Sequence, residues 1–273
     1  MISHLLGGGD GICLLKPNKN DVIARYLYYY LSTIQIENKD KYERHYKYLK
    51  TIKIPLPPLE IQQSIVFECE QIDSEYTSAQ KTIEEAKKHI TEIMKGAQLK
   101  VSSKLKLSDK HIFAISIGKR VLSSEMNDNY NIPVYSANVF EPFGYINKLL
   151  INDFSMPSII WGVDGDWQVN TIKENIPFYP TDHCGVIRII DKQIQAKYVS
   201  WVISKAGEKE GFNRSYRASM ERIESMSIEL PSSDIQKQAI AQIEKLESDI
   251  ADAKNILATA SDRKKAVLEK YLC

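Results

Sequence analysis

The chain has 273 residues, of which 43% are hydrophobic, a length and composition typical of a soluble protein with one large or two modest packed domains. Its 36 basic and 35 acidic residues give a formal net charge of +1, which excludes a globally basic nucleic-acid-binding protein and leaves only a local basic patch for such a role. Four scattered cysteines, the lack of a signal peptide and the lack of a run of about 20 apolar residues predict a cytoplasmic protein with no membrane partner.

The N-terminal 53 residues begin with a glycine-rich stretch that lacks the Gly-Lys-Ser/Thr ending of a phosphate-binding loop and is interpreted as a flexible turn. A short strand is expected at Ile12–Leu15, followed by a helix that Asn20 or Asp21 caps. This helix carries an aromatic cluster made of Tyr26, Tyr28, Tyr29 and Tyr30.

A long coiled-coil helix is predicted next. The segment Ile54–Leu59 is expected to be extended, because its three prolines remove hydrogen-bond donors and restrict the residues before them. From Glu60 to Gln98 apolar residues recur at alternating steps of four and three, which is the seam of a coiled coil. The predicted contact residues of this seam are Ile65, Ile72, Tyr76, Ile83 and Ile90.

Short β-type runs separated by Gly, Pro and Asn fill residues 101–232, which indicates an α+β region. The expected strands are His111–Ile117, Pro133–Ser136, Ser158–Trp161, Trp167–Asn170 and Gly185–Ile190, and a helix is expected at Gln195–Ala206.

The proline segment and the helix after it occur twice. Ile228–Gln236 repeats Ile54–Gln62 with a shift of 174 residues, and the heptad pattern returns from Asp234 to the C-terminus. The predicted contacts of this second seam are Ile243, Leu246, Ile250 and Leu257, and Lys264 interrupts it. Two such helices related by a pseudo-twofold axis are expected to pack as an antiparallel coiled coil. The alternative is a zipper between separate chains.

The two repeats are unequal in extent. Upstream of the proline segments, Arg25-Tyr26-Leu27 corresponds to Lys197-Tyr198-Val199 with a shift of 172 residues. Residues 1–50 therefore correspond to residues 173–223, and residues 101–171 have no counterpart. The chain is predicted to hold one complete unit preceded by the tail of another.

Catalytic and metal-binding motifs are missing from the sequence. The five histidines show no metal-ligand spacing, and the pair His183-Cys184 without a second pair is a weak zinc signal. Asp164 and Asp166 offer two carboxylates for a divalent cation, but their Gly-rich run favours a tight hairpin. We therefore expect a non-catalytic chain with no cofactor or metal of its own.

Binding signals are clearer. Lys209, Arg214 and Arg217 lie with Tyr216 in a segment suited to phosphate contacts, although neighbouring glutamates also fit an ordinary solvated loop. Side chains able to read base edges are expected on the β-rich region, with core packing as the alternative for both tryptophans. These candidate readers are Lys119, Arg120, Ser136, Asn138, Trp161, Asp164 and Trp167.

The arrangement resembles the specificity (S) subunit of type I restriction-modification systems, with an apparent truncation at the N-terminus. The resemblance rests on the Ile-x-Leu-Pro-type segments and acidic-Ile-Gln triplets at 54–62 and 228–236, and on Phe178–Cys184 before an apolar strand. It implies a partial target-recognition domain at 1–53, a proline lead-in and helix at 54–99, a complete target-recognition domain at 100–232 and a second helix at 233–273.

The resemblance also implies a function. An S subunit is a non-catalytic reader of double-stranded DNA that recognises a bipartite target, one half-site per domain, and docks modification subunits. Those subunits methylate adenine with S-adenosylmethionine, and restriction subunits add cleavage that needs ATP and Mg. The single complete domain suggests a half-subunit, two copies of which form a homodimer. The alternatives are a coiled-coil adaptor without DNA contact and the recognition portion of a single-chain restriction-methylation enzyme.

Overall fold

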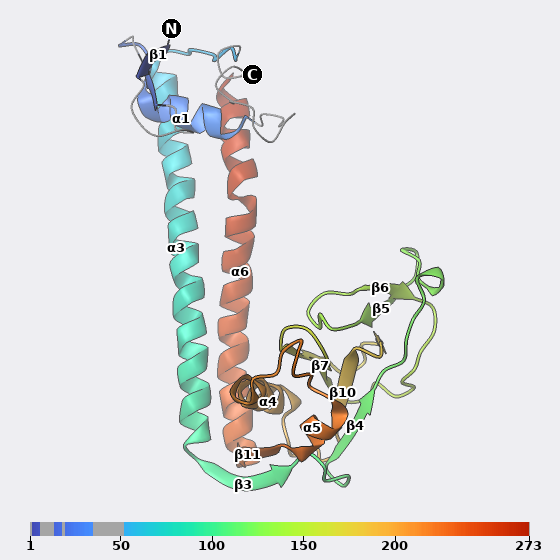
Figure 1. Cartoon of the computed structure of the whole chain (residues 1–273). Helices are drawn as coiled ribbons and strands as arrows, with labels where there is room; N and C mark the ends of the chain where they lie inside the picture. The colour runs from blue at the N-terminus through green and yellow to red at the C-terminus, as the bar shows by residue number, and fades with distance from the viewer. Residues whose placement is uncertain (1, 6–13, 18–19, 35–51, 273) are drawn as a thin grey trace. The chain divides into compact units, whose positions relative to one another are not determined.

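Two 40-residue helices, α3 (Leu59–Gln98) and α6 (Ser233–Leu272), dominate the computed structural model, which describes residues 2–5, 14–17, 20–34 and 52–272 (Figure 1). Both helices begin within one residue of the predicted position. The chain divides into two units: unit 1 comprises Met1–Lys88 and Leu246–Cys273, and unit 2 comprises His89–Lys245. Each helix therefore contributes one end to each unit. None of the helices in the described ranges is long and apolar enough to cross a membrane.

Within the described residues, unit 1 contains three elements besides the helix ends. β1 (Ile2–Leu5) pairs antiparallel with β2 (Leu14–Pro17), and α1 (Ala24–Ser32) carries the tyrosine cluster. The strand expected at Ile12–Leu15 overlaps β2, but Ile12 and Cys13, like the glycine-rich stretch before them, lie outside the described residues. The predicted cap of α1 is wrong, because the N-cap residue is Ile23 and no side chain caps it.

The core of unit 1 forms where α1 packs on the two long helices, as Figure 1 shows near the chain ends. Its buried members are Tyr26, Tyr29, Ile65, Cys69, Ile72, Ala260, Val267 and Leu268. Glu68 pairs with Lys270 at 2.7 Å and Glu75 with Arg263 at 2.6 Å, so residue numbers rise along α3 as they fall along α6. The two helices are antiparallel, as predicted.

Lys264, which interrupts the second heptad seam, has a specific partner. Its ammonium group pairs with Asp73, whose other oxygen accepts a 2.6 Å hydrogen bond from the Tyr29 hydroxyl. Partial burial alone would raise the pKa of Asp73, but the hydrogen bonds from Lys264 and Tyr29 outweigh it and hold the pKa below its ordinary value. The charge in the seam is therefore neutralised by a carboxylate of the facing helix.

Most predicted seam residues are removed from water. Ile65, Ile72 and Ile243 are buried, and Ile83, Ile90, Leu246, Ile250 and Leu257 are half-buried. Tyr76 is the most exposed of the predicted seam residues, at 36%.

Unit 2 holds three antiparallel or mixed sheets and two short helices. The strand orders are β4-β10-β7-β8, β6-β5-β9 and β11-β3. The bounds are β3 Val101–Lys106, β4 Phe113–Ile117, β5 Ile132–Tyr135, β6 Gly144–Ile146, β7 Ser158–Gly162, β8 Val169–Ile172, β9 Tyr179–Pro180, β10 Cys184–Ile189, β11 Ser227–Pro231, α4 Ala196–Glu210, α5 Met220–Ser225 and the 3-10 turn Ser123–Glu125. All five predicted strands and the predicted helix are present, and β3, β6, β9, β11 and α5 were not predicted.

The main core of unit 2 lies between α4 and the four-stranded sheet. Tyr198, Val199, Val202 and Ile203 form one face of α4, and all four are buried together with Ile159 and Ile187 of the sheet. This spacing is the apolar stripe of an amphipathic helix, and β10, the interior strand between β4 and β7, has five of its six residues buried. The predicted α+β fold is confirmed.

The sequence repeat is also a structural repeat, held by a buried glutamine in each unit. Gln62 accepts a hydrogen bond from the Ile23 N–H and donates to the Pro57 carbonyl, both at 2.8 Å. Gln236 accepts from the Gln195 N–H at 3.0 Å and donates to the Pro231 carbonyl at 2.8 Å. Each glutamine thus binds the N-terminus of the short helix, α1 or α4, to the end of its proline segment.

Candidate nucleic-acid interface

The turn Thr181–His183, between β9 and β10, gathers the ends of three other strands. The Thr181 N–H donates to the Tyr135 carbonyl at the end of β5, at 2.9 Å. The Val163 N–H, just after β7, donates to the His183 carbonyl at 3.0 Å, and the Gly118 N–H, just after β4, donates to the Cys184 carbonyl at 3.0 Å. Loops that follow β4, β5 and β7 therefore meet at one place on unit 2.

Gly118 is required for this meeting. A Cβ atom at position 118 would lie 2.0 Å from the Pro180 carbonyl oxygen, a distance that no side chain allows. The backbone passes so close because the next residue, Lys119, donates its N–H to the same carbonyl at 3.1 Å. The glycine thereby brings Lys119 and Arg120 beside the turn.

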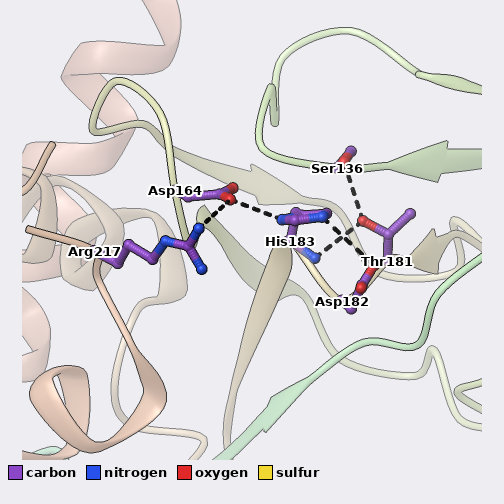
Figure 2. A network of polar contacts seen from close by, with 6 residues as sticks. All are labelled: Ser136, Asp164, Thr181, Asp182, His183 and Arg217. Carbon is purple, nitrogen blue, oxygen red and sulfur yellow. Dashed lines mark hydrogen bonds and ion pairs between the residues drawn. The ribbon is translucent and has the colours of Figure 1, made fainter. Parts of the chain in front are cut away.

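Four ionisable side chains, those of Asp164, Asp182, His183 and Arg217, form a network beside this turn (Figure 2), in which Asp182 Oδ1 lies 3.9 Å from His183 Nε2. His183 Nδ1 lies 2.9 Å from Asp164 Oδ2, and Arg217 approaches the same oxygen at 3.9 Å. Because a carboxylate only accepts, Nδ1 carries the proton, and the other ring nitrogen, Nε2, is an acceptor when His183 is neutral and a donor when it is charged. The Asp164 side chain is only 18% exposed. Asp164 therefore holds His183 and Arg217 in place instead of facing a ligand itself.

A hydroxyl pair completes the group in Figure 2. The Thr181 hydroxyl donates to Ser136 Oγ at 3.1 Å and accepts from the His183 N–H at 3.3 Å. Ser136 is half-buried at the end of β5, next to the turn. The arrangement offers hydroxyl, imidazole and guanidinium groups on one surface, which are groups that pair with base edges and phosphates.

The hairpin between β7 and β8 carries Asp164 to its position. Gly165 lies in the left-handed region at φ 88°, which glycine adopts without a steric penalty. β7 pairs antiparallel with β8, so the hairpin predicted from the run around Asp164 and Asp166 is present, but its connection, residues 163–168, is longer than a tight turn. No group of three or more His, Cys, Asp or Glu side chains is placed to hold a metal ion within the described ranges.

The segment after α4 carries Arg217 to the same place. The Ala218 N–H donates to the Val163 carbonyl at 3.0 Å, and the Ala218 carbonyl accepts from the indole of Trp161 at 2.9 Å. Asn213 folds the preceding turn by accepting from the N–H groups of Ser215 and Tyr216. The position of Arg217 thus depends on contacts with the β7–β8 hairpin.

Aromatic rings stack along this segment. Trp167 packs on Phe212 with ring centroids 5.1 Å apart, and Phe212 stacks on Tyr216 at 5.6 Å. The guanidinium of Arg222 lies 4.0 Å from the centroid of the Tyr216 ring, a cation–π contact. The stack fixes Tyr216, which is 39% exposed, as a platform beside Arg217.

The predicted cations lie on the surface of unit 2. Lys119, Arg120, Lys209 and Arg214 are exposed and have no ion-pair partner among the residues that the structure describes. Asn138 is exposed, but its side-chain oxygen accepts from the Phe140 N–H at 3.0 Å and so shapes its own turn. Unpaired exposed cations are available for phosphate groups without breaking an internal contact.

The structure corrects the prediction that Trp161 and Trp167 read base edges. Trp161 is completely buried in the core, and its indole N–H is used by Ala218. Trp167 is half-buried, and its indole N–H donates to the Ser204 carbonyl of α4 at 2.8 Å. Their large apolar rings gain more by filling the space against α4 and the sheet, so both act by positioning the loops.

Two members of the site, Thr181 and His183, were not among the predicted DNA-binding residues. In the sequence, His183 was considered only together with its neighbour Cys184, as a weak signal for a zinc site. Cys184 is buried, and burial raises the pKa of its thiol to about 12, which disfavours the thiolate form. The signal that could have found them is the polar Thr-Asp-His run directly before an apolar strand.

The sequence matches the family model of the type I restriction modification DNA specificity domain over residues 8–88 and 105–260, most of the chain. The chain belongs to this family. The family match falls in two stretches, one in each part of the internal repeat. Among curated proteins, no sequence relative matches.

A solved structure shares the fold of this specificity-domain protein. The S subunit of the type I restriction-modification system from M. genitalium is 15% identical with a TM-score of 0.65, and the match covers 95% of this chain and 75% of that one. The HsdS subunit from Thermoanaerobacter tengcongensis is 15% identical with a TM-score of 0.47, over 90% of this chain and 69% of that one. The first match shows that the protein has the fold of an S subunit.

Proposed function

We propose that this protein is the DNA specificity subunit of a type I restriction-modification complex, and that unit 2 reads one half-site of a bipartite target. The observation that carries the proposal is the convergence on unit 2 of four polar loops, with Arg217 and His183 held by Asp164 and exposed cations beside them. The family match and the S-subunit fold support it.

The chain contributes recognition and not chemistry in this proposal. Lys119, Arg120, Lys209 and Arg214 contact phosphates, while Ser136, His183 and Arg217 face base edges. The paired ends of α3 and α6 dock modification subunits, which use S-adenosylmethionine to methylate adenine. Restriction subunits with ATP and Mg join the same complex, and two copies of the chain read a symmetric interrupted site.

The test is a methylation assay with the cognate modification subunit. The full chain and that subunit are expressed together, and methylated adenines are mapped by sequencing. We expect methylation at one interrupted motif only when both proteins are present, and a palindromic motif if two copies act together. No motif despite a purified complex would refute DNA recognition and favour the coiled-coil adaptor.

Charge variants locate the interface within the same assay. Arg214→Glu with Arg217→Glu should abolish methylation and lower DNA affinity by at least tenfold, because two phosphate or base contacts become repulsive. Lys254→Glu, at an exposed position in the middle of α6 and in unit 1, is the matched control and should leave methylation intact. Equal loss in the double variant and the control would show that the effect is not local to unit 2.

A further inference from the structure

The loop between β5 and β6, residues 136–143, is held in place by the β7–β8 hairpin. The Gln168 side chain accepts a hydrogen bond from the Val139 N–H at 3.3 Å, and the Asn170 side chain donates to the Val139 carbonyl at 2.8 Å. Val139 itself is completely buried in a core that it forms with residues of β7, β8 and β10. Val139 therefore anchors the middle of the loop through both its backbone and its side chain.

The same loop lies against the residues that carry Asp164. A Cβ atom at Gly162, the last residue of β7, would lie 2.4 Å from the Ala137 carbonyl oxygen, so the two backbones are in contact. Asp164 follows two residues later, and Ser136, a member of the group in Figure 2, is the first residue of the loop. The loop is therefore continuous with the candidate nucleic-acid interface.

Phe140, the residue directly after the anchor, is presented to solvent. It is 59% exposed, and Asn138 folds the backbone beside it by accepting from the N–H groups of Phe140 at 3.0 Å and Glu141 at 3.3 Å. A single exposed apolar residue is ordinary on a protein surface. Here, however, the exposed ring follows a doubly anchored residue next to the candidate interface. Its backbone is already ordered, so binding through this ring costs little conformational entropy.

A flat aromatic ring at this place suits the stacked bases of duplex DNA. Proteins that deform DNA insert apolar side chains such as phenylalanine between two base pairs and unstack that step. The carboxylate of the neighbouring Glu141 is repelled by phosphates, whereas it can accept a hydrogen bond from the amino group of a cytosine. The ring therefore fits a base-pair step within a groove better than it fits the sugar-phosphate backbone.

The reach of this ring follows from the length of the loop. Phe140 is four residues from Ser136, and because an extended chain advances at most about 3.6 Å per residue, their Cα atoms lie within about 14 Å of each other. Base pairs follow one another at about 3.4 Å, so this distance corresponds to about four base pairs. A step that Phe140 contacts therefore lies inside the half-site that Ser136 faces, or borders it.

We propose that Phe140 inserts its ring between two base pairs of the half-site and makes recognition depend on how easily that step unstacks. Pyrimidine–purine steps such as TA and CA deform at the lowest cost, so the protein should prefer one of them at this position. The role rests on the proposed reading of DNA by unit 2. It adds a specificity-determining residue that contacts neither a base edge nor a phosphate.

The experiment uses the full chain with its modification subunit and duplexes that carry the motif found by methylation mapping. 2-Aminopurine, a base analogue whose fluorescence rises on unstacking, is placed in turn at each position of the half-site except the methylated adenine. We expect the fluorescence to rise at least threefold at one step with the wild type and not with Phe140→Ala. Phe140→Leu, which keeps an apolar side chain, should retain most of the rise.

Phe143 provides the matched control in the same loop. It is a phenylalanine of similar exposure, 63%, and its N–H donates to the Val134 carbonyl at 2.7 Å, which places it at the start of the β5–β6 pairing. Phe143→Ala should therefore keep the full fluorescence change.

Binding measurements separate insertion from other roles of the ring. Phe140→Ala should weaken DNA binding roughly tenfold, as expected for the loss of one base stack, and should leave the salt dependence of binding unchanged. Replacing the pyrimidine–purine step by a purine–pyrimidine step should weaken binding of the wild type at least fivefold more than binding of Phe140→Ala. The midpoint of thermal unfolding should not change, because the ring that is removed is exposed.

Three results would overturn the proposal while leaving DNA recognition by unit 2 in place. The first is specific binding with the same fluorescence and affinity for Phe140→Ala and the wild type. The second is an equal loss in Phe140→Ala and Phe143→Ala. The third is a tenfold loss of co-purification with the modification subunit in Phe140→Ala without a change at any base step, which would assign the ring to a protein contact. A wild-type complex that binds no specific DNA would refute the proposed function and this inference together.

Discussion

The buried glutamines offer the sharpest test of how the repeat is built. Gln62 makes three hydrogen bonds, with the Ile23 N–H and with the carbonyls of Asp21 and Pro57, each at 2.8 Å. Gln236 makes two, with the Gln195 N–H and the Pro231 carbonyl. Methionine has nearly the same length and helix propensity, so Gln→Met removes the hydrogen bonds and little else.

The expected cost follows from the number of bonds. A lost hydrogen bond that leaves its partner unsatisfied costs about 1 kcal/mol or more, so Gln62→Met should destabilise unit 1 by about 3 kcal/mol and Gln236→Met should destabilise unit 2 by about 2 kcal/mol. Unfolding of a chain with two units need not be two-state, so hydrogen exchange is the better assay. The Ile23 amide should exchange roughly 100-fold faster in Gln62→Met, since 1.4 kcal/mol is about tenfold.

The chain supplies matched controls for both variants. Gln63 and Gln238 are exposed glutamines of the same helix ends, and their substitution by methionine should change stability by less than about 0.5 kcal/mol. If Gln62→Met exchanges like Gln63→Met at the Ile23 amide, the glutamine does not hold α1 and the reasoning is wrong.

Three further predictions follow from the structure. Hydrogen bonds from Lys270 and then Tyr271 lower the pKa of Glu68 below its ordinary 4.5, so this stabilisation is present above pH 4.5 and is lost as the pH falls through the lower folded value. The protection of amides near Glu68 from hydrogen exchange, relative to their intrinsic rates, should fall between about pH 5 and pH 3, and Lys270→Met should remove most of that difference. Gly118→Ala should lower the free energy of unfolding by about 1–3 kcal/mol in thermal unfolding and reduce DNA binding. Gly96→Ala is the control: a Cβ atom there would meet nothing within 4 Å, so this variant should stabilise α3 by about 0.5–1 kcal/mol. Equal effects of the two substitutions would refute the close approach at Gly118. Trp161→Phe should cost about 1–3 kcal/mol in urea unfolding, because the buried Ala218 carbonyl loses its donor, and unchanged stability would contradict that role.

Local patterns predicted α1, α3, α4, α6 and five of the strands of unit 2. α3 and α6 were found because heptad periodicity and the preceding prolines are features of adjacent residues. β3 and β11 were missed because their pairing joins residues more than 120 positions apart. The N-cap of α1 was missed for the same reason, since its partner Gln62 lies 39 residues away.

The candidate site was predicted in its composition and not in its organisation. Arg217, Ser136 and Asp164 were all predicted as DNA-binding residues, and all three belong to the network in Figure 2. The sequence did not show that the Asp164 carboxylate positions its neighbours while the Arg217 cation faces a ligand. Trp161 was assigned to the surface because an aromatic residue suits both stacking on bases and core packing, and burial alone distinguishes the two.

The sequence by itself determined the duplicated architecture, because repeated spacing of prolines, glutamines and apolar residues requires repeated local structure. The tertiary structure decided which loops meet at Thr181–His183, that Asp164 holds His183 and Arg217, and that Leu56 is exposed where Leu230 is buried. These outcomes depend on strands and turns far apart in the chain that come together only when the sheets form, and no local pattern records which of them will be neighbours.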